Sequence, residues 1–401
     1  MSRLGWSALL GACVTGAALA LGSRPLTVAG VGILMAALIA RIWAGAAAGP
    51  VTLAFSIEPQ LATEGDRVGL AVEMHRASRA PVGSITLRGT LGRHGDLECR
   101  LSGSGRVARG AVDLGRLPRG RYQLRDAEVV LGDHLGLADV SMPVAARAAV
   151  VVRPRLVDLT ALFSDVGRFG NDGRRLLLRR PVGFDFHSVR EYEQGESLRR
   201  VHWPTTARRG HLMVKELQDS PRDTVAVLLD CDPAGAAGET PGSSFDVAVR
   251  AAGSLVRALV VRGRRASLVT TGRDPQAVLV RALDGDFVAA LDVLAAAEPD
   301  APHALAHALR RAQSEALQAG ELFVVTASLT PPAVEQLVRA ATHRPVSVVW
   351  IDAPSFGGRP TKADPGTLRL VASGIPTAVV RSGDDLAAAL DLASSHARAH
   401  A

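Results

Sequence analysis

Cysteine and aromatic residues are scarce in this 401-residue chain. The three cysteines, Cys13, Cys99 and Cys231, are too few and too widely separated for a disulfide framework or a metal cluster. Their scarcity favours a reducing compartment. Aromatic residues make up 4% of the sequence, with two Tyr and four Trp. A segment that combines Tyr and Trp is therefore unusual in this chain.

The overall composition is that of a folded protein. Hydrophobic residues account for 47% and charged residues for 21%, which excludes general disorder. The length accommodates two or three domains, each with its own core. The formal net charge of +7 permits attraction to nucleic acid, anionic lipid or an acidic partner, and it does not choose among them.

Two apolar runs, Leu4–Gly22 and Leu26–Gly45, open the chain and are separated by Ser23-Arg24-Pro25. Each run is about 18–20 residues long, which is about what a helix needs to cross a bilayer. The alternative is a cleaved signal peptide formed by the first run, but the second run has no place in a signal peptide. We therefore predict a transmembrane helical hairpin over residues 1–48, with Trp6 and Trp43 at the same membrane face.

Basic residues at the ends of this hairpin predict its orientation. Arg3, the amino terminus and Arg41 outweigh Arg24 in the turn. Positive charge is retained on the cytoplasmic side of membranes. The chain is thus expected to be a multi-pass cell-membrane protein with two spans and cytoplasmic soluble domains.

Residues 49–157 have the pattern of an all-β domain. Apolar and polar residues alternate over 51–57, 67–74 and 84–91. Short turn sequences rich in Gly and Asp separate these segments at the spacing expected of a β-sandwich. No combination of nucleophile, base and orienting group occurs here, so a spacer or protein-binding role is favoured.

Residues 222–401 alternate between strand and helix patterns. The continuous apolar run 224–230 is typical of a strand buried on both faces. A helix is predicted over 243–262, where Ser243 and Asp246 form a capping-box pattern. Further strands are predicted at 266–271, 322–326, 346–351 and 377–380, and helices at 285–297, 303–319, 331–343 and 384–398, the last beginning at a Ser382/Asp385 capping pair. This alternation predicts a Rossmann-like, mostly parallel sheet with helices on both faces.

Two carboxylates, Asp230 and Asp232, follow the first of these strands. Ligands in such sheets bind beyond the carboxyl ends of the strands, and carboxylates suit Mg²⁺ or Ca²⁺. The arrangement resembles a von Willebrand factor type A domain, whose metal site begins Asp-x-Ser-x-Ser. Here Asp232 and Ala234 stand at the two serine positions, and Ala327 stands where that family commonly has an aspartate. These substitutions predict a degenerate site that binds no metal tightly, and we interpret Ser243 and Ser244 as helix caps.

Residues 158–221 form an Arg/Gly-rich segment without a clean helix or strand period, which predicts an extended, loop-rich connector. Between Arg168 and Glu216 there are 11 Arg or Lys and 6 Asp or Glu. The run Arg190–Arg209 contains one of the two tyrosines and one of the four tryptophans of the chain.

Three functions compete for this run. A nucleic-acid strip would use Arg on phosphates and Tyr192 and Trp203 on bases, but interspersed glutamates oppose it. A hydrolytic site would use His202 with Glu193 or Glu196, but no nucleophile is suitably spaced. A partner-docking element is favoured, because Arg and Trp anchor protein interfaces.

The spacing within this run resembles the signature of the domain of unknown function 58 family. The matching residues are Arg190, Tyr192, Gly195, Arg199, His202, Trp203, Ala207 and Arg208, followed by Leu212, Val214, Lys215 and Glu216. Glu196 and Pro204 depart from the usual residues of that family. The resemblance also covers the order of two membrane spans, a β-rich segment and a von Willebrand type A-like domain.

This resemblance implies a membrane-attached partner of a MoxR-type AAA+ ATPase, acting in chaperone-like assembly or envelope-related processes. It establishes no catalytic activity. The sequence therefore predicts a non-enzymatic interaction protein without a cofactor. A divalent-metal-dependent ligand-binding module that uses Asp230 and Asp232 is the alternative, and a hydrolase that uses His202 is the third hypothesis.

Overall fold

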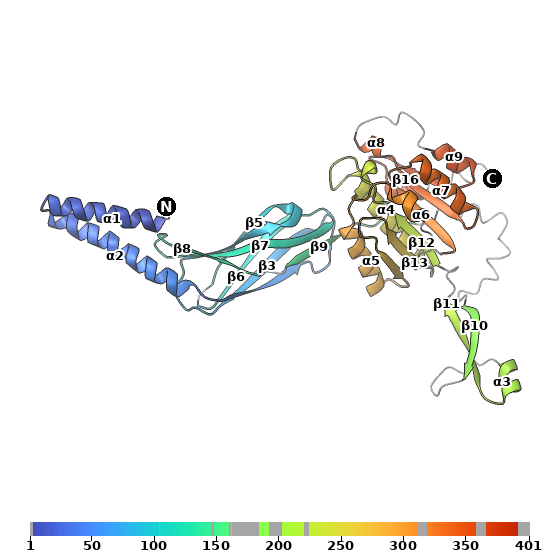
Figure 1. The fold of residues 1–401 in the computed structure, drawn as a ribbon, viewed down its shortest axis with the longest axis horizontal. Coiled ribbons are helices and arrows are strands. Elements are labelled where there is room, and N and C mark those ends of the chain that lie inside the picture. Colours follow the sequence, from blue (N-terminus) through green and yellow to red (C-terminus); the bar gives the residue numbers. More distant parts are fainter. Residues whose placement is uncertain are drawn as a thin grey trace. The chain divides into compact units, whose positions relative to one another are not determined.

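A computed structural model describes residues 3–103, 105–145, 148–159, 162, 184–191, 203–219, 224–310, 319–357 and 366–391 (Figure 1). The chain divides into two compact units, Met1–Arg153 and Pro154–Ala401.

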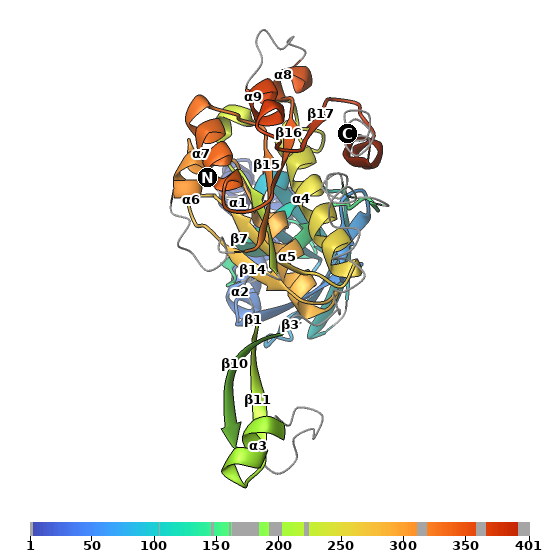
Figure 2. The ribbon, with the colours of Figure 1, turned by 90° about the vertical axis from the view of Figure 1, so that its right-hand side faces the viewer.

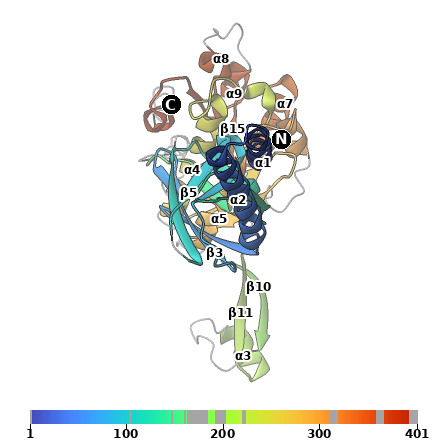
Figure 3. The same cartoon turned by 90° about the vertical axis from the view of Figure 1, so that its left-hand side faces the viewer.

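Two apolar helices, α1 (Arg3–Ala20) and α2 (Arg24–Ala47), begin the first unit and pack side by side (Figure 3). Gly30 lies so close to Thr15 of α1 that a Cβ at this position would clash with the threonine. Small residues thus fill the contact between the helices. Large apolar side chains point outward, namely Leu9, Leu10, Leu19, Val28, Val31, Met35, Leu38, Ile39 and Ile42. Within the described residues, α2 alone is long and apolar enough to span a membrane, and α1 is a shorter apolar helix.

The rest of the first unit is rich in β structure, as predicted. One antiparallel sheet has the order β1 (Val51–Glu58), β3 (Arg67–Arg76) and β6 (Val107–Arg116). The second sheet has the order β2 (Ala62–Thr63), β9 (Ala149–Arg153), β7 (Gly120–Gly132), β4 (Ser84–Leu91) and β5 (Asp96–Leu101), with β8 (Asp139–Pro143) beside β7. A short 3₁₀ helix, η1 (Gly92–His94), joins β4 to β5.

Both sheets contribute to one hydrophobic core. Alternate residues of β3, from Val68 to Met74, are buried in it, because successive side chains of a strand point to opposite faces. The core also includes Ala47 at the end of α2, with Trp43 packed against it. The last turn of α2 is therefore part of the β-rich domain.

The second unit is built on a six-stranded sheet with the order β14 (Ala277–Val280), β13 (Arg265–Thr270), β12 (Thr224–Leu229), β15 (Glu321–Thr326), β16 (Val346–Ile351) and β17 (Thr377–Val380). All neighbouring pairs are parallel except β13 and β14, which are antiparallel. The predicted mostly parallel sheet is confirmed. The short edge strand β14 was not predicted from the sequence.

Helices cover both faces of this sheet (Figure 2). Val225, Val227 and Leu229 of β12 pack with α4 (Ser244–Val261) and α5 (Gly285–Ala296). Ala226 and Leu228 face the opposite side, where α6 (Ala304–Arg310), α7 (Pro331–Ala341) and α9 (Thr367–Ala372) pack. The central strand is thus buried on both faces, which explains its unbroken apolar sequence.

Two local predictions are corrected by the structure. The segment expected to be a loop-rich connector contains an antiparallel pair, β10 (Phe184–Glu191) and β11 (Met213–Asp219), and the short helix α3 (Trp203–Arg209). The expected Ser382/Asp385 capping pair does not form. The Asp385 carboxylate accepts from the N–H of Ala387, and the Ser382 N–H donates to Ser355 Oγ in the helical turn α8 (Ala353–Phe356).

Candidate functional site

The strand order of the second unit reverses at β12. The chain passes from β12 to β13 on one side, and β15 lies on the other. The carboxyl ends of β12 and β15 therefore form the topological switch point of the sheet, where ligands of doubly wound proteins bind. Asp230 and Asp232 follow β12 at this point. Thr271 follows β13, and Thr326 and Ser328 stand at the end of β15. We call these five residues the strand-end cluster.

Asp230 is held by hydroxyl groups from both neighbouring strands. Thr326 Oγ1 donates to Asp230 Oδ2 at 2.7 Å, and Thr271 Oγ1 lies 3.4 Å from Asp230 Oδ1. The aspartate is 3% exposed. Burial raises the pKa of Asp230 from 3.8 to about 7, and the nearby charge of Asp232 acts in the same direction. The two threonine hydrogen bonds oppose this rise.

Asp232 ties three loops together. Its Oδ1 accepts from the N–H of Ala234 at 2.9 Å and caps the 3₁₀ helix η5 (Pro233–Gly235). Its Oδ2 accepts from the N–H of His303 at 3.0 Å and lies 3.4 Å from Ser328 Oγ. His303 has a positive φ of 55°, a conformation that a non-glycine residue adopts at an energetic cost. The Asp232 carboxylate stabilises this strained backbone.

Serine residues complete the loop that follows β12. Ser243 forms the predicted capping box with Asp246 at the start of α4. Ser244 is not a cap, contrary to the prediction. Its hydroxyl donates to the carbonyl of Gly235 at 2.6 Å and accepts from the N–H of Ala237 at 2.9 Å. It therefore closes the loop that carries Asp232.

Ala327 lies directly against this loop. A Cβ on Gly235 would lie 2.7 Å from both the carbonyl carbon and the Cβ of Ala327. The position at which the sequence resemblance predicts an aspartate is thus packed against a glycine. A larger side chain there would force the loop away from the sheet.

Every carboxylate oxygen of Asp230 and Asp232 has a donor supplied by the protein. Within the described residues, no group of three or more His, Cys, Asp or Glu side chains is placed to hold a metal ion. A cation at this point would use the two carboxylates together with the hydroxyls of Thr271, Thr326 or Ser328. Cys231 is not an activated nucleophile, because burial raises the pKa of its thiol to about 12.

A second candidate site lies at the end of the β10–β11 pair. α3 is tied to β11 by the N–H of Met213, which donates to Thr206 Oγ1 at 3.0 Å. The helix ends where the N–H of Gly210 donates to the carbonyl of Thr206, with Gly210 at a φ of +74°. Met213 is 1% exposed, so the base of this turn is packed. We call residues 203–212 the hairpin tip.

The hairpin tip exposes the side chains that the sequence analysis selected there. Trp203 is 65% exposed, and Ala207, Arg208 and Arg209 are exposed as well. Arg190 lies on β10. The other predicted motif residues lie outside the described residues: Tyr192, Gly195, Arg199 and His202.

Sequence reasoning missed the hydroxyl partners of the two aspartates. Thr271, Thr326 and Ser328 were not selected, although each stands at the end of a predicted strand. Applying the rule about strand ends to all three central strands would have found them. The other surroundings of the cluster, such as the N–H of His303, have no sequence signal.

The second unit is thus a doubly wound α/β domain with a polar cluster at its switch point. Residues 188–354, from β10 to α8, match the model of the family described as "Protein of unknown function DUF58". The resemblance predicted from the Arg190–Arg209 run is confirmed, because this match includes that run.

The chain is similar to a curated relative over about two thirds of its length. The "Uncharacterized protein YeaD" of Bacillus subtilis is 23% identical over 276 residues, which cover 66% of this chain and 67% of that protein. Among solved structures, the "von Willebrand factor type A from Catenulispora acidiphila" is similar at 13% identity and a TM-score of 0.29, over 45% of this chain and 43% of that one. Cwp6 from Clostridium difficile is similar at 9% identity and a TM-score of 0.21, over 74% of this chain and 36% of that one. The chain spans less than half of either solved structure.

Proposed function

We propose that this protein is a membrane-anchored, non-enzymatic interaction protein whose hairpin tip docks a partner. The observation that carries the proposal is the exposure of Trp203. Tryptophan is rare in this chain, and a side chain that is 65% exposed, on the same short helix as Arg208 and Arg209, contributes little to the core. Trp and Arg are the residues that most often anchor interfaces when a partner covers them.

The backbone of the tip supports this role. Thr206 fixes α3 to β11, and Gly210 ends the helix in a defined conformation. A recognition element that is ordered before binding loses less conformational entropy when the partner arrives. Trp203 and Arg208 therefore lie on a backbone whose conformation is fixed by hydrogen bonds within the tip.

The proposed partner is a cytoplasmic MoxR-type AAA+ ATPase, as the family resemblance implies. Basic side chains at the tip are suited to an acidic surface on that partner. The proposed setting is chaperone-like assembly or an envelope-related process at the cell membrane.

The proposed anchor consists of both α1 and α2, with both ends of the hairpin in the cytoplasm. Its support is the inverted distribution of side chains, with small residues between the helices and large apolar residues outside. Membrane helices pack in this way, whereas soluble proteins rarely expose so large a contiguous apolar surface.

Co-purification tests the docking proposal. The full chain in detergent is mixed with a MoxR-type ATPase, and recovery of the ATPase is compared between wild type and Trp203→Ala/Arg208→Ala. We expect at least about a tenfold weaker affinity for the variant, as for loss of interface anchors. Leu368→Ala/Arg369→Ala on α9 is the matched control, because it also removes an exposed large apolar residue and an arginine. Equal recovery with both variants would remove the tip from the docking role.

A divalent-metal-dependent ligand-binding module at Asp230 and Asp232 is the second proposed function. The position of both carboxylates at the switch point favours it. Metal binding would be weakened because the carboxylate oxygens already accept hydrogen bonds from the protein, and a cation would have to displace those donors. Calorimetric titration of the full chain with Mg²⁺, Mn²⁺ and Ca²⁺ tests it, and no binding heat at millimolar metal would exclude it. A hydrolase that uses His202 stays a third hypothesis, for which loss of turnover in His202→Ala is the test.

A further inference from the structure

One end of the β-rich domain carries the loops that lie beside the end of α2. The register places the start of β1 beside the end of β3, since Val51 pairs with Arg76. The start of β4 lies beside the end of β7 and the start of β8. The loops 77–83 and 133–138, and residues 102, 103, 105 and 106, therefore lie at the same end as the α2–β1 junction. We call this the anchor end of the domain.

α2 is fixed to the anchor end by specific hydrogen bonds. Trp43 Nε1 donates to the carbonyl of Pro81 at 2.5 Å, and Ser78 Oγ donates to the carbonyl of Ala46 at 2.7 Å. The N–H of Ala77 donates to the carbonyl of Pro50 at 3.1 Å. The loop 77–83 thus cannot move away from the end of the helix without breaking these bonds.

The length of α2 places this loop close to a membrane surface. A helix of 24 residues is about 36 Å long, whereas the hydrocarbon layer is about 30 Å thick. About four residues therefore extend beyond the hydrocarbon, which matches the last turn of α2, where Ala47 belongs to the core of the β-rich domain and Trp43 packs against that core. The anchor end consequently lies at the level of the lipid headgroups.

Arginine side chains gather at the anchor end. Arg79 and Arg106 are exposed on two of its loops. Arg76 lies beneath them, 6% exposed, with its Nε donating to the carbonyl of Gly105 at 2.8 Å. Its Nη1 is buried and has no hydrogen-bond partner in the part of the chain that the structure describes. The charge of Arg76 is thus poorly compensated, and a nearby anion would stabilise it.

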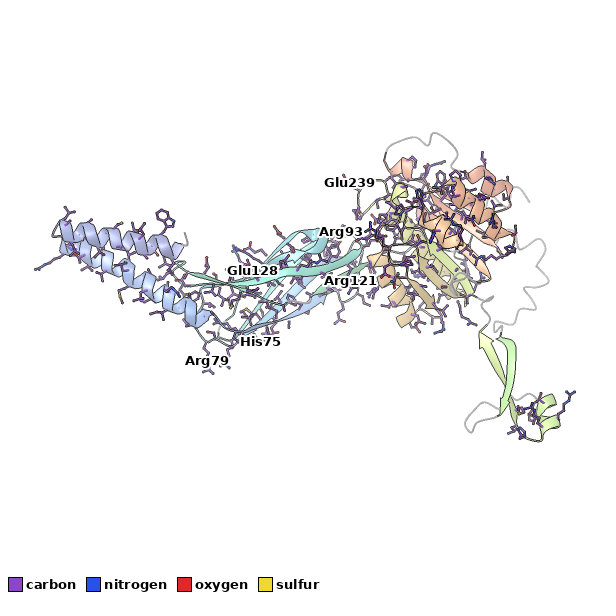
Figure 4. The ribbon with its side chains drawn as sticks, viewed as in Figure 1. His75, Arg79, Arg93, Arg121, Glu128 and Glu239 are labelled. Atoms are coloured by element: carbon purple, nitrogen blue, oxygen red, sulfur yellow. The ribbon has the colours of Figure 1, made fainter. Side chains whose placement is uncertain are left out.

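The neighbouring acidic groups compensate this charge only in part. Asp133 is engaged by its own loop, because its Oδ1 accepts from the N–H groups of Leu137 and Ala138. Asp139 is exposed at the start of β8. His75, next to Arg76, is paired with Glu73, which also binds Arg109. Figure 4 shows His75 and Arg79 together near the end of α2, and Arg121 farther along the domain.

The loop 133–138 adds an apolar tip. Leu135 is 63% exposed there, followed by Gly136 with a φ of +67°. An exposed leucine on a loop beside the basic loop 77–83 and near an apolar helix is the composition of a surface that inserts shallowly into a bilayer interface.

We propose that the anchor end is a lipid-facing surface that binds anionic phospholipid headgroups, with Arg79 and Arg106 on the phosphates, Arg76 beneath them and Leu135 inserted among the headgroups. The inference rests on the membrane anchor proposed above. The anionic cytoplasmic leaflet attracts basic residues near its surface, and this complements the proposed orientation. Lipid binding would give the β-rich domain a second attachment to the membrane, beside the end of α2.

The depth of position 135 tests the apolar contact. The full chain carries Cys13→Ser and Leu135→Cys, and a fluorophore is attached to the introduced thiol; Cys99 and Cys231 are buried. In nanodiscs that contain phosphatidylcholine and phosphatidylglycerol, lipids with a quencher near the headgroup should quench this label. Leu61→Cys is the matched control, because Leu61 is also 63% exposed and lies at the other end of the domain.

A label on native Cys13, exposed on α1, separates this inference from the anchor itself. If lipids with a quencher on the acyl chain quench position 13, in the middle of α1, but headgroup quenchers treat positions 135 and 61 alike, the anchor stands and the inference is overturned. If the acyl-chain quenchers do not reach position 13, the anchor proposal fails, and the inference fails with it.

Charge reversal tests the anionic contact. We measure energy transfer from the label at position 135 to headgroup-labelled phosphatidylglycerol and, separately, phosphatidylcholine. About a fivefold preference for phosphatidylglycerol is expected, which is the scale of one basic residue at an anionic surface. Arg79→Glu/Arg106→Glu should abolish it, whereas Arg116→Glu/Arg121→Glu, the same charge change at the other end of the domain, should leave it intact.

An unchanged preference in Arg79→Glu/Arg106→Glu would overturn the assignment of these arginines. Arg79→Gln/Arg106→Gln provides the same test, with a partial loss expected, if charge reversal prevents folding. Salt should weaken the wild-type preference, because exposed charges are screened within about 10 Å at 0.1 M ionic strength.

Discussion

The strand-end cluster and the hairpin tip use polar residues in opposite ways. In the cluster, Asp230 and Asp232 are nearly buried, and every carboxylate oxygen has a donor. In the tip, Trp203 and Arg208 stand exposed on a backbone held by Thr206. In the strand-end cluster, the hydrogen bonds of the two aspartates join loops of the protein to one another. In the hairpin tip, the side chains of Trp203 and Arg208 stay outside the core, where a partner can contact them.

Because of this difference, substitutions in the two regions of the second unit should affect different properties of the protein. Changes in the cluster should alter folding strongly, because a buried polar group that loses its partner carries the cost of desolvation. Changes in the tip should alter binding and leave folding almost intact, as is usual for exposed residues. The two regions can therefore be compared with matched substitutions.

The largest expected effect follows from Thr326→Val in the cluster. This isosteric change removes the hydroxyl that donates to Asp230 and that accepts from the N–H of Ser328. We expect the free energy of unfolding to fall by about 2–4 kcal/mol, since both partners are left without their bond. Hydrogen exchange of peptides from β12 and β15 in the full chain measures it. Wild-type protection in the variant would show that the cluster is not a stabilising network.

The next effect is a dependence of stability on pH. The pKa of Asp230 is raised from 3.8 to about 7 in the folded protein, so the folded state holds a proton that the unfolded state releases at lower pH. Stability should therefore fall as pH rises between about 4 and 7, and this contribution should be constant outside that window. Asp230→Asn should remove this component of the slope. Thermal melts of both proteins across the window measure it, and parallel curves would contradict the raised pKa.

A smaller effect is expected for Thr206→Val, the same substitution in the tip. It removes the acceptor for the N–H of Met213 and frees α3 from β11. Because Thr206 is only partly buried, we expect a local loss of about 0.5–1.5 kcal/mol, seen as faster hydrogen exchange at residues 205–213. Partner binding should weaken although Trp203 is unchanged. Unaltered binding would show that order in the tip is not required.

The smallest effect on stability is expected for Trp203→Ala. The free energy of unfolding should change by no more than about 0.5 kcal/mol, because the side chain is mostly exposed. The same melts and exchange measurements serve as readouts. A loss comparable to that of Thr326→Val would mean that Trp203 supports the fold, and the contrast between the two regions would disappear.

Much of the fold was predictable because its signals are local. The unbroken apolar run of β12, the capping box of Ser243 and Asp246 and the start of α7 at Pro331 all depend on residues within one turn or strand. The β10–β11 pair was missed because the Arg and Gly content of that segment obscured the alternation of Phe184 and Phe186. The strand β14 was missed because its four residues are too few to show the alternation of apolar and polar residues that marks a strand.

The site was predictable only in part. The sequence alone determined the elements, the two apolar runs, the position of Asp230 and Asp232 after a buried strand, and the family resemblance of the Arg190–Arg209 run, because each is a pattern of near neighbours. Only the tertiary structure decided that Thr271 and Thr326 meet Asp230, across 41 and 96 positions of sequence, and that the exposed Trp203 stands on a tip fixed by Thr206. Such contacts depend on strand order, which is set by burial of the whole sheet and not by any local period.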